Sequence, residues 1–407
     1  MFISAIKSFR AIALFILLLS LPLSCASPGQ AGSVDQDSQS ASKSLSSYAA
    51  DWNRLFFRSS GWFGGDGIFG IPLDGKEFVP AGPQTRTLFI FSDSVIGNTK
   101  DGKVGSGDFK MIHNLVAYLD GSEPAPGKFE FYWPEGEDGK PATLFVPQTP
   151  HTQPGDYYWL GDGFVNVDAD STLYIFAYQV RDVPTGAFFE FEQVGVSLIA
   201  ISPGSEPPFN EQRQMETPFF SPLEDGSGNI TFGSGIFVNT ASAGAPNPDG
   251  YIYIYGVAGI YQELHVARVR PESFENFSTW QFWDGQDWNS EMKASKSVTN
   301  SVSNELSLSP LPDGRYLLVH QRYGMLPEVA VQVAKSPVGP FFPAKDIWHC
   351  PEVDEDIDYF VYNAKAYPHL SKPGELLVSY NVNSFDFFKD ILTDPQLCRP
   401  RFIRLRL

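Results

Sequence analysis

The sequence predicts an all-β fold, specifically a five-bladed β-propeller with four antiparallel strands in each blade. Three observations support this prediction. Aromatic residues make up 14% of the 407-residue chain, and 36 Gly with 32 Pro supply many turns, a mixture that favours short strands. From about residue 51 onward, apolar and polar residues alternate with period two, and no segment has the spacing of an amphipathic helix. The predicted strands also recur in groups, as in repeated sheets packed around an axis.

The N-terminal segment has the features of a signal peptide. Lys7 and Arg10 form a basic start, and the apolar run that follows is too short for an ordinary membrane span. We therefore assign residues 1–25 to a signal peptide, 26–50 to a flexible tether and 51–407 to a single propeller domain. Cleavage before Cys25 would leave a lipoprotein in a bacterial cell envelope, and an ordinary cleavage site would give a secreted protein. Both alternatives predict export.

The strands are expected in five groups. The first two groups comprise residues 65–72, 85–96, 111–119 and 128–133, then 157–167, 172–180, 193–201 and 213–218. The next two comprise 230–239, 251–257, 264–269 and 280–283, then 301–310, 315–321, 329–334 and 346–350. The fifth comprises only 359–367, 375–381 and 399–407. We expect residues 53–58 to supply its fourth strand and so to close the ring.

Charge and motif content exclude several functions. The net charge of −18 would repel a phosphate backbone, so we expect no nucleic-acid partner. The sequence contains no phosphate-binding loop and no clustered zinc ligands, and we expect a monomer that needs no cofactor. The acidic residues 354–358 could hold a structural Ca²⁺ or form a solvated turn. Cys350 and Cys398 could form a disulfide or remain two buried thiols.

Polar residues at the starts of the inner strands converge on one mouth of a propeller. They are Asp66, Asp162, Ser234, Glu305 and Asn363. Asp93 joins them, because Asp66 and Asp93 are equally far from a turn-rich hairpin centre near residue 80. Two neighbouring carboxylates, of which one has a raised pKa, suit glycoside hydrolysis. The alternatives are turn positions for the aspartates that neighbour glycine, and an ion pair of Glu305 with Arg322 or Lys365.

Other polar and aromatic residues near this mouth are candidates for substrate binding. Trp62 and Trp159 precede the first two inner strands and could stack on sugar rings, or pack at the top of their blades. His369 follows the last inner strand, where it could contact substrate or make a structural hydrogen bond. The full predicted set is Trp62, Trp159, Asp162, Asn304, Asn363, His369 and Tyr380.

Six short motifs occur in order along the mature chain: GWFGGDG at 61–67, FIFSDS at 89–94, NELS at 304–307, DGRY at 313–316, NAKAYPH at 363–369 and SYNVN at 379–383. Through these motifs the chain resembles bacterial five-bladed propeller glycoside hydrolases. It is most similar to exported families of unknown function that include endo-D-arabinanases. The resemblance implies a catalytic pair, Asp66 and Asp93, with Glu305 as a third acid.

The resemblance leaves the substrate open. The two aspartates are further apart in sequence than in the arabinanases, and Ser92 stands where glycine is common. The expected function is therefore hydrolysis of a polysaccharide, with a furanoside such as arabinan as the leading candidate and a uronic-acid-containing glycan as another. The alternative function is a non-catalytic surface lipoprotein that binds glycan through aromatic residues at its rim.

Overall fold

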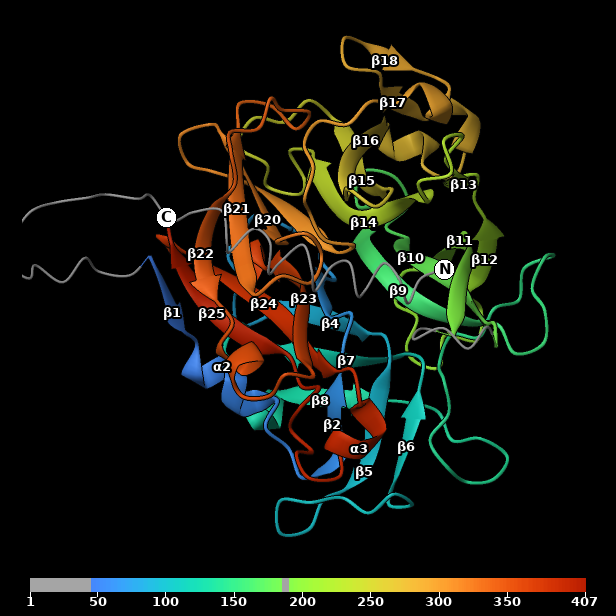
Figure 1. Ribbon diagram of the computed structural model, residues 1–407. Coiled ribbons are helices and arrows are strands. Elements are labelled where there is room, and N and C mark those ends of the chain that lie inside the picture. Colours follow the sequence, from blue (N-terminus) through green and yellow to red (C-terminus); the bar gives the residue numbers. More distant parts are fainter. Residues whose placement is uncertain (1–44, 185–189) are drawn as a thin grey trace, which may run out of the picture.

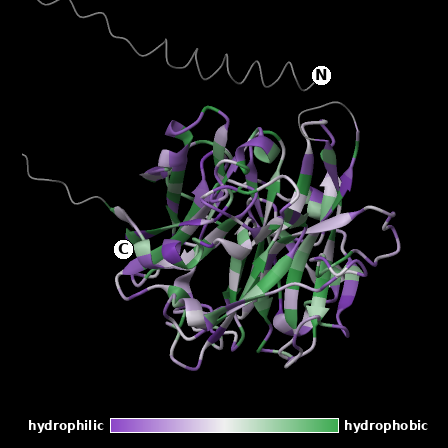
Figure 2. Ribbon diagram, turned by 90° about the horizontal axis from the view of Figure 1, so that it is seen from below, coloured by the Kyte–Doolittle hydropathy of each residue, from purple (hydrophilic) through white to green (hydrophobic). Residues whose placement is uncertain are grey.

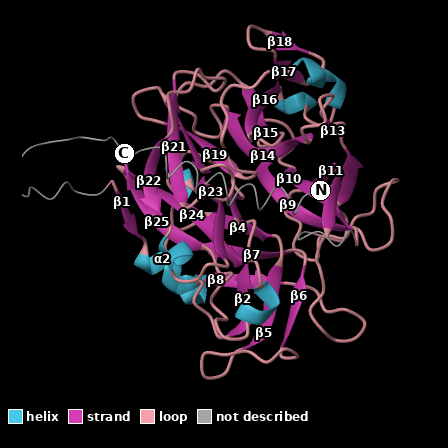
Figure 3. Ribbon diagram, viewed as in Figure 1, coloured by secondary structure: helices cyan, strands magenta, loops and turns pink. Residues whose placement is uncertain are grey.

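The computed structural model describes residues 45–184 and 190–407, which form an all-β structure with a few short helices (Figures 1 and 3). The predicted signal peptide, Cys25 and most of the predicted tether lie outside the described residues. Within the described part of the chain, no helix is both long and apolar enough to cross a membrane.

The strands form antiparallel sheets that follow the predicted groups, except that the third sheet contains six strands instead of the expected four. The first sheet contains β3 (Phe69–Pro72), β4 (Arg86–Phe91), β7 (Leu115–Asp120) and β8 (Phe129–Tyr132). The second contains β9 (Tyr157–Val165), β10 (Leu173–Asp182), β11 (Phe191–Ile201) and β12 (Arg213–Glu216). The third contains β13 (Phe220–Pro222), β14 (Asn229–Asn239), β15 (Tyr251–Ala258), β16 (Glu263–Val269), β17 (Gln281–Trp283) and β18 (Trp288–Asn289).

The remaining sheets complete the structure. The fourth contains β19 (Leu306–Pro310), β20 (Tyr316–Gln321), β21 (Glu328–Ala334) and β22 (Lys345–His349). The fifth contains β23 (Tyr359–Ala366), β24 (Glu375–Ser384), β25 (Arg401–Arg406) and β1 (Ser46–Tyr48). A small additional sheet contains β2 (Ser60–Gly65), β5 (Ser94–Asn98) and β6 (Phe109–Ile112). In residues 45–184 and 190–407 the helices are α2 (Ala50–Leu55), α3 (Phe387–Asp390) and six 3₁₀ turns, at 126–128, 271–273, 277–279, 292–294, 351–354 and 368–370.

One strand from each of the five sheets lies beside a strand of the next sheet around a common centre. β3 contacts β9, β9 contacts β14, β14 contacts β19, and β19 contacts β23. Tyr367, which follows β23, contacts the chain just before β3, because its hydroxyl donates to the Ile68 carbonyl at 2.8 Å. Hydrophobic residues concentrate on the strands (Figure 2), and an apolar cluster fills the space between each neighbouring pair of sheets. The fold is therefore propeller-like.

The predicted strand at residues 53–58 is wrong. The first half of this segment lies in α2, because Trp52, Leu55 and Phe56 have the spacing of a helix face and pack into the core beside Phe402. Asn53 fixes the helix on the fifth sheet by donating from Nδ2 to the Phe402 carbonyl at 2.7 Å. The strand that pairs with β25 lies earlier in the chain, at Ser46–Tyr48.

The first sheet also differs from its prediction. The expected strands at 65–72, 85–96 and 111–119 are each broken in two, so that β2, β5 and β6 separate from β3, β4 and β7. Figure 1 shows the smaller sheet beyond the ends of the strands of the first one. The three breaks lie at the same level of the molecule, because the strand registers continue across them.

Candidate active site

Asp66 and Asp93 lie opposite each other at the first two strand breaks. Gly65 pairs with Ser94 on one side of the breaks and Phe69 pairs with Ile90 on the other, in the same register. The Asp66 backbone N–H donates to the Asp93 carbonyl at 3.1 Å, and the Ser92 N–H donates to the Asp66 carbonyl at 2.8 Å. The placement of these two residues in the predicted hairpin agrees with this register.

His113 occupies the third break and was missed by the sequence analysis. Ser94 pairs with Ile112, and Phe91 pairs with Leu115, so His113 lies opposite Asp93. Its Nδ1 lies 3.0 Å from Asp93 Oδ1. The imidazole also stacks on the Tyr157 ring, with centroids 3.8 Å apart and planes 14° apart. The hairpin argument that paired Asp66 with Asp93 would have found His113 if it had been applied to the next hairpin.

Asp66 is in an environment that favours its protonated form. The Tyr362 hydroxyl donates to Asp66 Oδ2 at 2.5 Å. Burial, followed by the charges of Asp93 and Glu305, raises the pKa of Asp66 to about 8, against the opposing effects of the Tyr362 hydrogen bond and Lys365. The residue is partly exposed, so a bound molecule could contact it.

Glu305 is buried in an ion pair, and its charge is close enough to act on Asp66. Its Oε2 pairs with Lys365 Nζ, and its Oε1 accepts a hydrogen bond from Asn363 Nδ2 at 2.8 Å. Burial raises the pKa of Glu305, and the charge of Lys365 opposes this shift. Of the two partners considered from sequence, Lys365 forms the pair, whereas Arg322 Nε binds Asp346 Oδ1 at 2.6 Å. Both oxygens of Glu305 are therefore engaged within the protein.

Asp162 also belongs to this polar centre, but its carboxylate holds two sheets together. Its Oδ1 accepts the Gly163 N–H at 2.8 Å and its Oδ2 accepts the Ile236 N–H on β14 at 2.7 Å. Burial raises the pKa of Asp162 to about 7 although these hydrogen bonds lower it. Asp162 lies in a register irregularity of β9, and β14 and β23 carry similar irregularities, which direct side chains toward the centre.

Three residues predicted to bind substrate are buried away from solvent. Trp62 is fully buried, with its ring stacked on Phe131 at 4.6 Å. Tyr380 is also buried and donates to Glu352 Oε2 at 2.9 Å. His369 Nε2 lies 3.2 Å from Thr87 Oγ1, and burial lowers the pKa of this histidine to about 3. These positions contradict direct contact with a substrate, because the three side chains are buried inside the protein.

Two other predicted residues remain accessible. Asn304 is exposed next to Glu305. Trp159 is partly exposed and contacts Phe191 edge-to-face, with centroids 4.7 Å apart. Asn363 is buried and binds Glu305. The structure thus brings Asp66, Asp93, Asp162, Glu305 and Asn363 together and leaves Trp159 and Asn304 near the surface.

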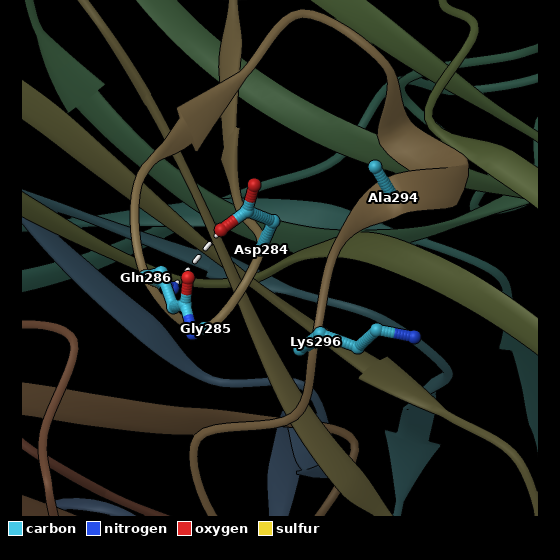
Figure 4. A pocket seen from close by; sticks show the side chains of 5 residues that line it. All are labelled: Asp284, Gly285, Gln286, Ala294 and Lys296. Carbon is cyan, nitrogen blue, oxygen red and sulfur yellow. Dashed lines mark hydrogen bonds between the residues drawn. The ribbon is translucent and has the colours of Figure 1, made fainter.

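Two open hollows lie elsewhere and contain none of these acids. One, of about 520 Å³, lies beside the hairpin between β17 and β18 and is lined by Asp284, Gly285, Gln286, Ala294 and Lys296 (Figure 4). The other, of about 430 Å³, includes Asp168, Arg270 and Glu272.

The sequence left two alternatives open, a structural Ca²⁺ site in the acidic run and a disulfide between Cys350 and Cys398. In residues 45–184 and 190–407, no group of three or more His, Cys, Asp or Glu side chains is arranged to hold a metal ion. In the acidic run, Asp354 Oδ2 lies 3.0 Å from His349 Nε2, and Asp356 accepts the Asp358 N–H at 2.9 Å. Cys350 and Cys398 are two free, buried thiols, which excludes the disulfide alternative.

Comparisons with known proteins show the family and the fold. Residues 49–406 match the model of the family described as "Domain of unknown function (DUF5005)", and the chain therefore belongs to this family. No curated protein matches the chain. A crystal structure described as a "putative hydrolase" from Bacteroides ovatus is 19% identical with a TM-score of 0.67, and the match covers 88% of this chain and 89% of that one. At this identity, the similarity shows a shared fold.

Two further solved structures are less similar. An exo-β-1,3-galactanase from Phanerochaete chrysosporium is 10% identical with a TM-score of 0.44, over 85% of this chain and 62% of that one. An α-L-arabinofuranosidase from Podospora anserina is 12% identical with a TM-score of 0.41, over 85% of this chain and 96% of that one.

Proposed function

We propose that this member of the DUF5005 family is an exported glycoside hydrolase that cleaves a polysaccharide with Asp66 and Asp93. One observation carries the proposal: the two carboxylic acids lie opposite each other at aligned strand breaks, and the pKa of Asp66 is raised to about 8. Glycoside hydrolysis uses two carboxyl groups beside the scissile bond, one of which donates a proton, and Asp66 and Asp93 lie together as such a pair.

The environments of the two acids suggest their roles. With its pKa raised to about 8, Asp66 would hold a proton at neutral pH and donate it to the leaving glycosidic oxygen. Asp93 would act as the base or the nucleophile, and His113, 3.0 Å away, would orient its carboxylate. Glu305, expected from sequence as a third catalytic acid, has both oxygens engaged by Lys365 and Asn363. We therefore assign Glu305 a positioning role, in which its charge helps to raise the pKa of Asp66.

The proposal extends to architecture and location. The five sheets would be the blades of one propeller, closed where β1 pairs with β25. The basic and apolar features of residues 1–25 support export, with Cys25 as the point of lipid attachment or cleavage next to it as the alternative. The protein would act as a monomer without a cofactor. The resemblance to arabinan-degrading families supports a furanoside such as arabinan as the first substrate to test.

The test is product release from a panel of polysaccharides that includes arabinans and arabinogalactans, with purified residues 27–407. We expect release by the wild type and by Asp120→Asn, an exposed aspartate at the far end of β7, but not by Asp66→Asn or Asp93→Asn. Retention of the wild type on a glycan gel without any release would overturn the enzyme and favour the glycan-binding lipoprotein.

A further inference from the structure

Asp66, Asp93 and Glu305 form what we call the acid cluster. Three loops near it form an exposed apolar surface, which we call the tyrosine platform. The loops are residues 259–262 between β15 and β16, residues 322–327 between β20 and β21, and residues 297–304 before β19. The exposed large side chains on them are Ile260 (67%), Tyr261 (65%), Tyr323 (50%), Met325 (39%) and Leu326 (41%). Isolated apolar residues are common on protein surfaces, but a contiguous group indicates a binding site.

Backbone hydrogen bonds join the three loops into one unit. The Ser301 N–H donates to the Tyr261 carbonyl at 3.1 Å, and the Tyr323 N–H donates to the Ser301 carbonyl at 2.9 Å. The Val302 N–H donates to the Gln262 carbonyl at 3.2 Å. The exposed side chains are therefore displayed on connected backbone and not on independent loops.

The same unit contains backbone strain. Gln262, Ser301 and Tyr323 have φ values of +50°, +64° and +45°. Residues other than glycine rarely adopt this left-handed region, and such strain concentrates at ligand-binding sites, where the surrounding structure holds it. Here each strained residue takes part in the backbone hydrogen bonds between the loops.

The chemistry of the platform suits a neutral ligand that is partly apolar and rich in hydroxyl groups. In a chain with a net charge of −18, these three segments contain one charged residue, Arg322, which is paired with Asp346. Their other polar residues are Ser, Thr, Asn and Gln, which hydrogen-bond to hydroxyl groups. Tyrosine rings accept the C–H face of a sugar, so the composition favours an uncharged glycan over an ionic ligand or an anionic membrane.

The platform is continuous with the acid cluster. Ser303 Oγ accepts the Gln321 N–H at 3.0 Å and donates to the Glu305 carbonyl at 2.6 Å. The first of these bonds links the end of β20, which leads to Tyr323, to the segment that carries Glu305. Asn304, which lies between Ser303 and Glu305 in the chain, is exposed.

We propose that the tyrosine platform binds consecutive uncharged sugar units of the glycan on one side of Asp66 and Asp93. This inference rests on the proposed function. The platform extends over loops of the third and fourth sheets, and such a surface can contact more than one sugar unit.

The experiment separates binding from turnover by using the inactive Asp66→Asn background. Retention is measured by affinity electrophoresis in gels that contain arabinan, arabinogalactan, galactan or xylan. On the polysaccharide that retains this parent, we expect the added pair Tyr261→Ala and Tyr323→Ala to weaken binding about tenfold or more, since stacking contributes up to about this factor per ring. The matched control is Phe342→Ala, which removes an exposed ring beyond the opposite end of β21.

A second measurement uses active protein and substrates of increasing chain length. We expect the loss in kcat/KM caused by Tyr261→Ala and Tyr323→Ala to grow with chain length, and thermal unfolding to be unchanged because both rings are exposed. Equal losses at all lengths, or unchanged retention, would overturn the platform while the hydrolase stands. If the active wild type cleaves none of the panel, the proposed function fails and the platform fails with it.

Discussion

Asp66 and Asp162 are two aspartates of the same polar centre, and their neighbours differ in kind. Burial raises the pKa of both, to about 8 and about 7. Asp162 uses its two oxygens to accept the N–H groups of Gly163 and Ile236, which fixes β9 against β14. Asp66 faces a second carboxylate, Asp93, and the hydroxyl of Tyr362. A raised pKa therefore does not identify a catalytic acid by itself; the groups that the carboxyl faces decide its role.

The largest effect that this comparison predicts is on turnover by Asp66→Asn. We expect kcat to fall by about 10²- to 10⁴-fold, the usual contribution of general acid catalysis, because an amide cannot donate the proton at neutral pH. Product release from the best polysaccharide substrate measures this loss, and circular dichroism checks the fold. Retained turnover in Asp66→Asn would place Asp66 with Asp162 among the structural acids.

The buried ion pair of Glu305 with Lys365 tests how an acid of this centre contributes to stability. Lys365→Met leaves the Glu305 carboxylate buried without its counter-charge, and we expect the free energy of unfolding to fall by about 3–5 kcal/mol. The double variant Lys365→Met with Glu305→Gln should recover much of this loss, because it removes the unpaired charge. Urea titrations of the two variants provide the measurement, and equal destabilisation of both would show that packing matters more than charge.

Asp162→Ala should affect stability and spare chemistry. It leaves the N–H groups of Gly163 and Ile236 without their acceptor, and we expect a loss of about 1–3 kcal/mol in the free energy of unfolding. Turnover per folded molecule, measured well below the unfolding transition, should remain near that of the wild type. A loss of turnover as large as that of Asp66→Asn would erase the distinction between the two aspartates.

Most strands could be predicted from sequence because they are short apolar or alternating runs bounded by turn residues, and those such as β10 and β20 are buried on both faces. The same signal could not show that Asp66, Asp93 and His113 interrupt three strands at one level, since apolar residues continue on both sides of each break. The N-terminal strand was missed because three residues, Ser46–Tyr48, are too few to show alternation. Trp52, Leu55 and Phe56 have helical spacing in the sequence, and this spacing predicts α2 better than a strand at residues 53–58.

The candidate site was predictable where backbone register determined it and was not predictable where burial did. The pairing of Asp66 with Asp93 follows from the position of one hairpin, and the pairing of Glu305 with Lys365 follows from the need of a buried acid for a cation. Trp62 and Tyr380 were placed at the site from residue type, yet both fill space between strands and sheets. An aromatic side chain near a strand start supplies either a binding surface or core volume, and sequence alone does not separate these uses.

His113→Gln tests whether the residue at the third strand break contributes to catalysis by orienting Asp93. Glutamine keeps a hydrogen-bond donor but loses the ring that stacks on Tyr157, so the group beside Asp93 would lose its fixed orientation. We expect kcat to fall roughly tenfold, with KM unchanged, because a 1.4 kcal/mol loss in transition-state stabilisation corresponds to that factor. A change in KM alone would instead indicate that His113 contacts the substrate.

The smallest expected effect is the pH dependence that Asp66 imposes. Its carboxyl loses its proton as the pH rises through about 8, so kcat/KM should halve near that pH and decrease further above it. Stability follows the same proton: between the unfolded pKa near 3.9 and the folded value, the folded state binds more protons, so rising pH destabilises it. Asp66→Asn lacks this group. As the pH is raised from 5 to 8, the unfolding temperature of the variant should therefore rise relative to that of the wild type. A constant difference between the two proteins over this range would mean that Asp66 is ionised at neutral pH, and the role of proton donor would then have to pass to another acid.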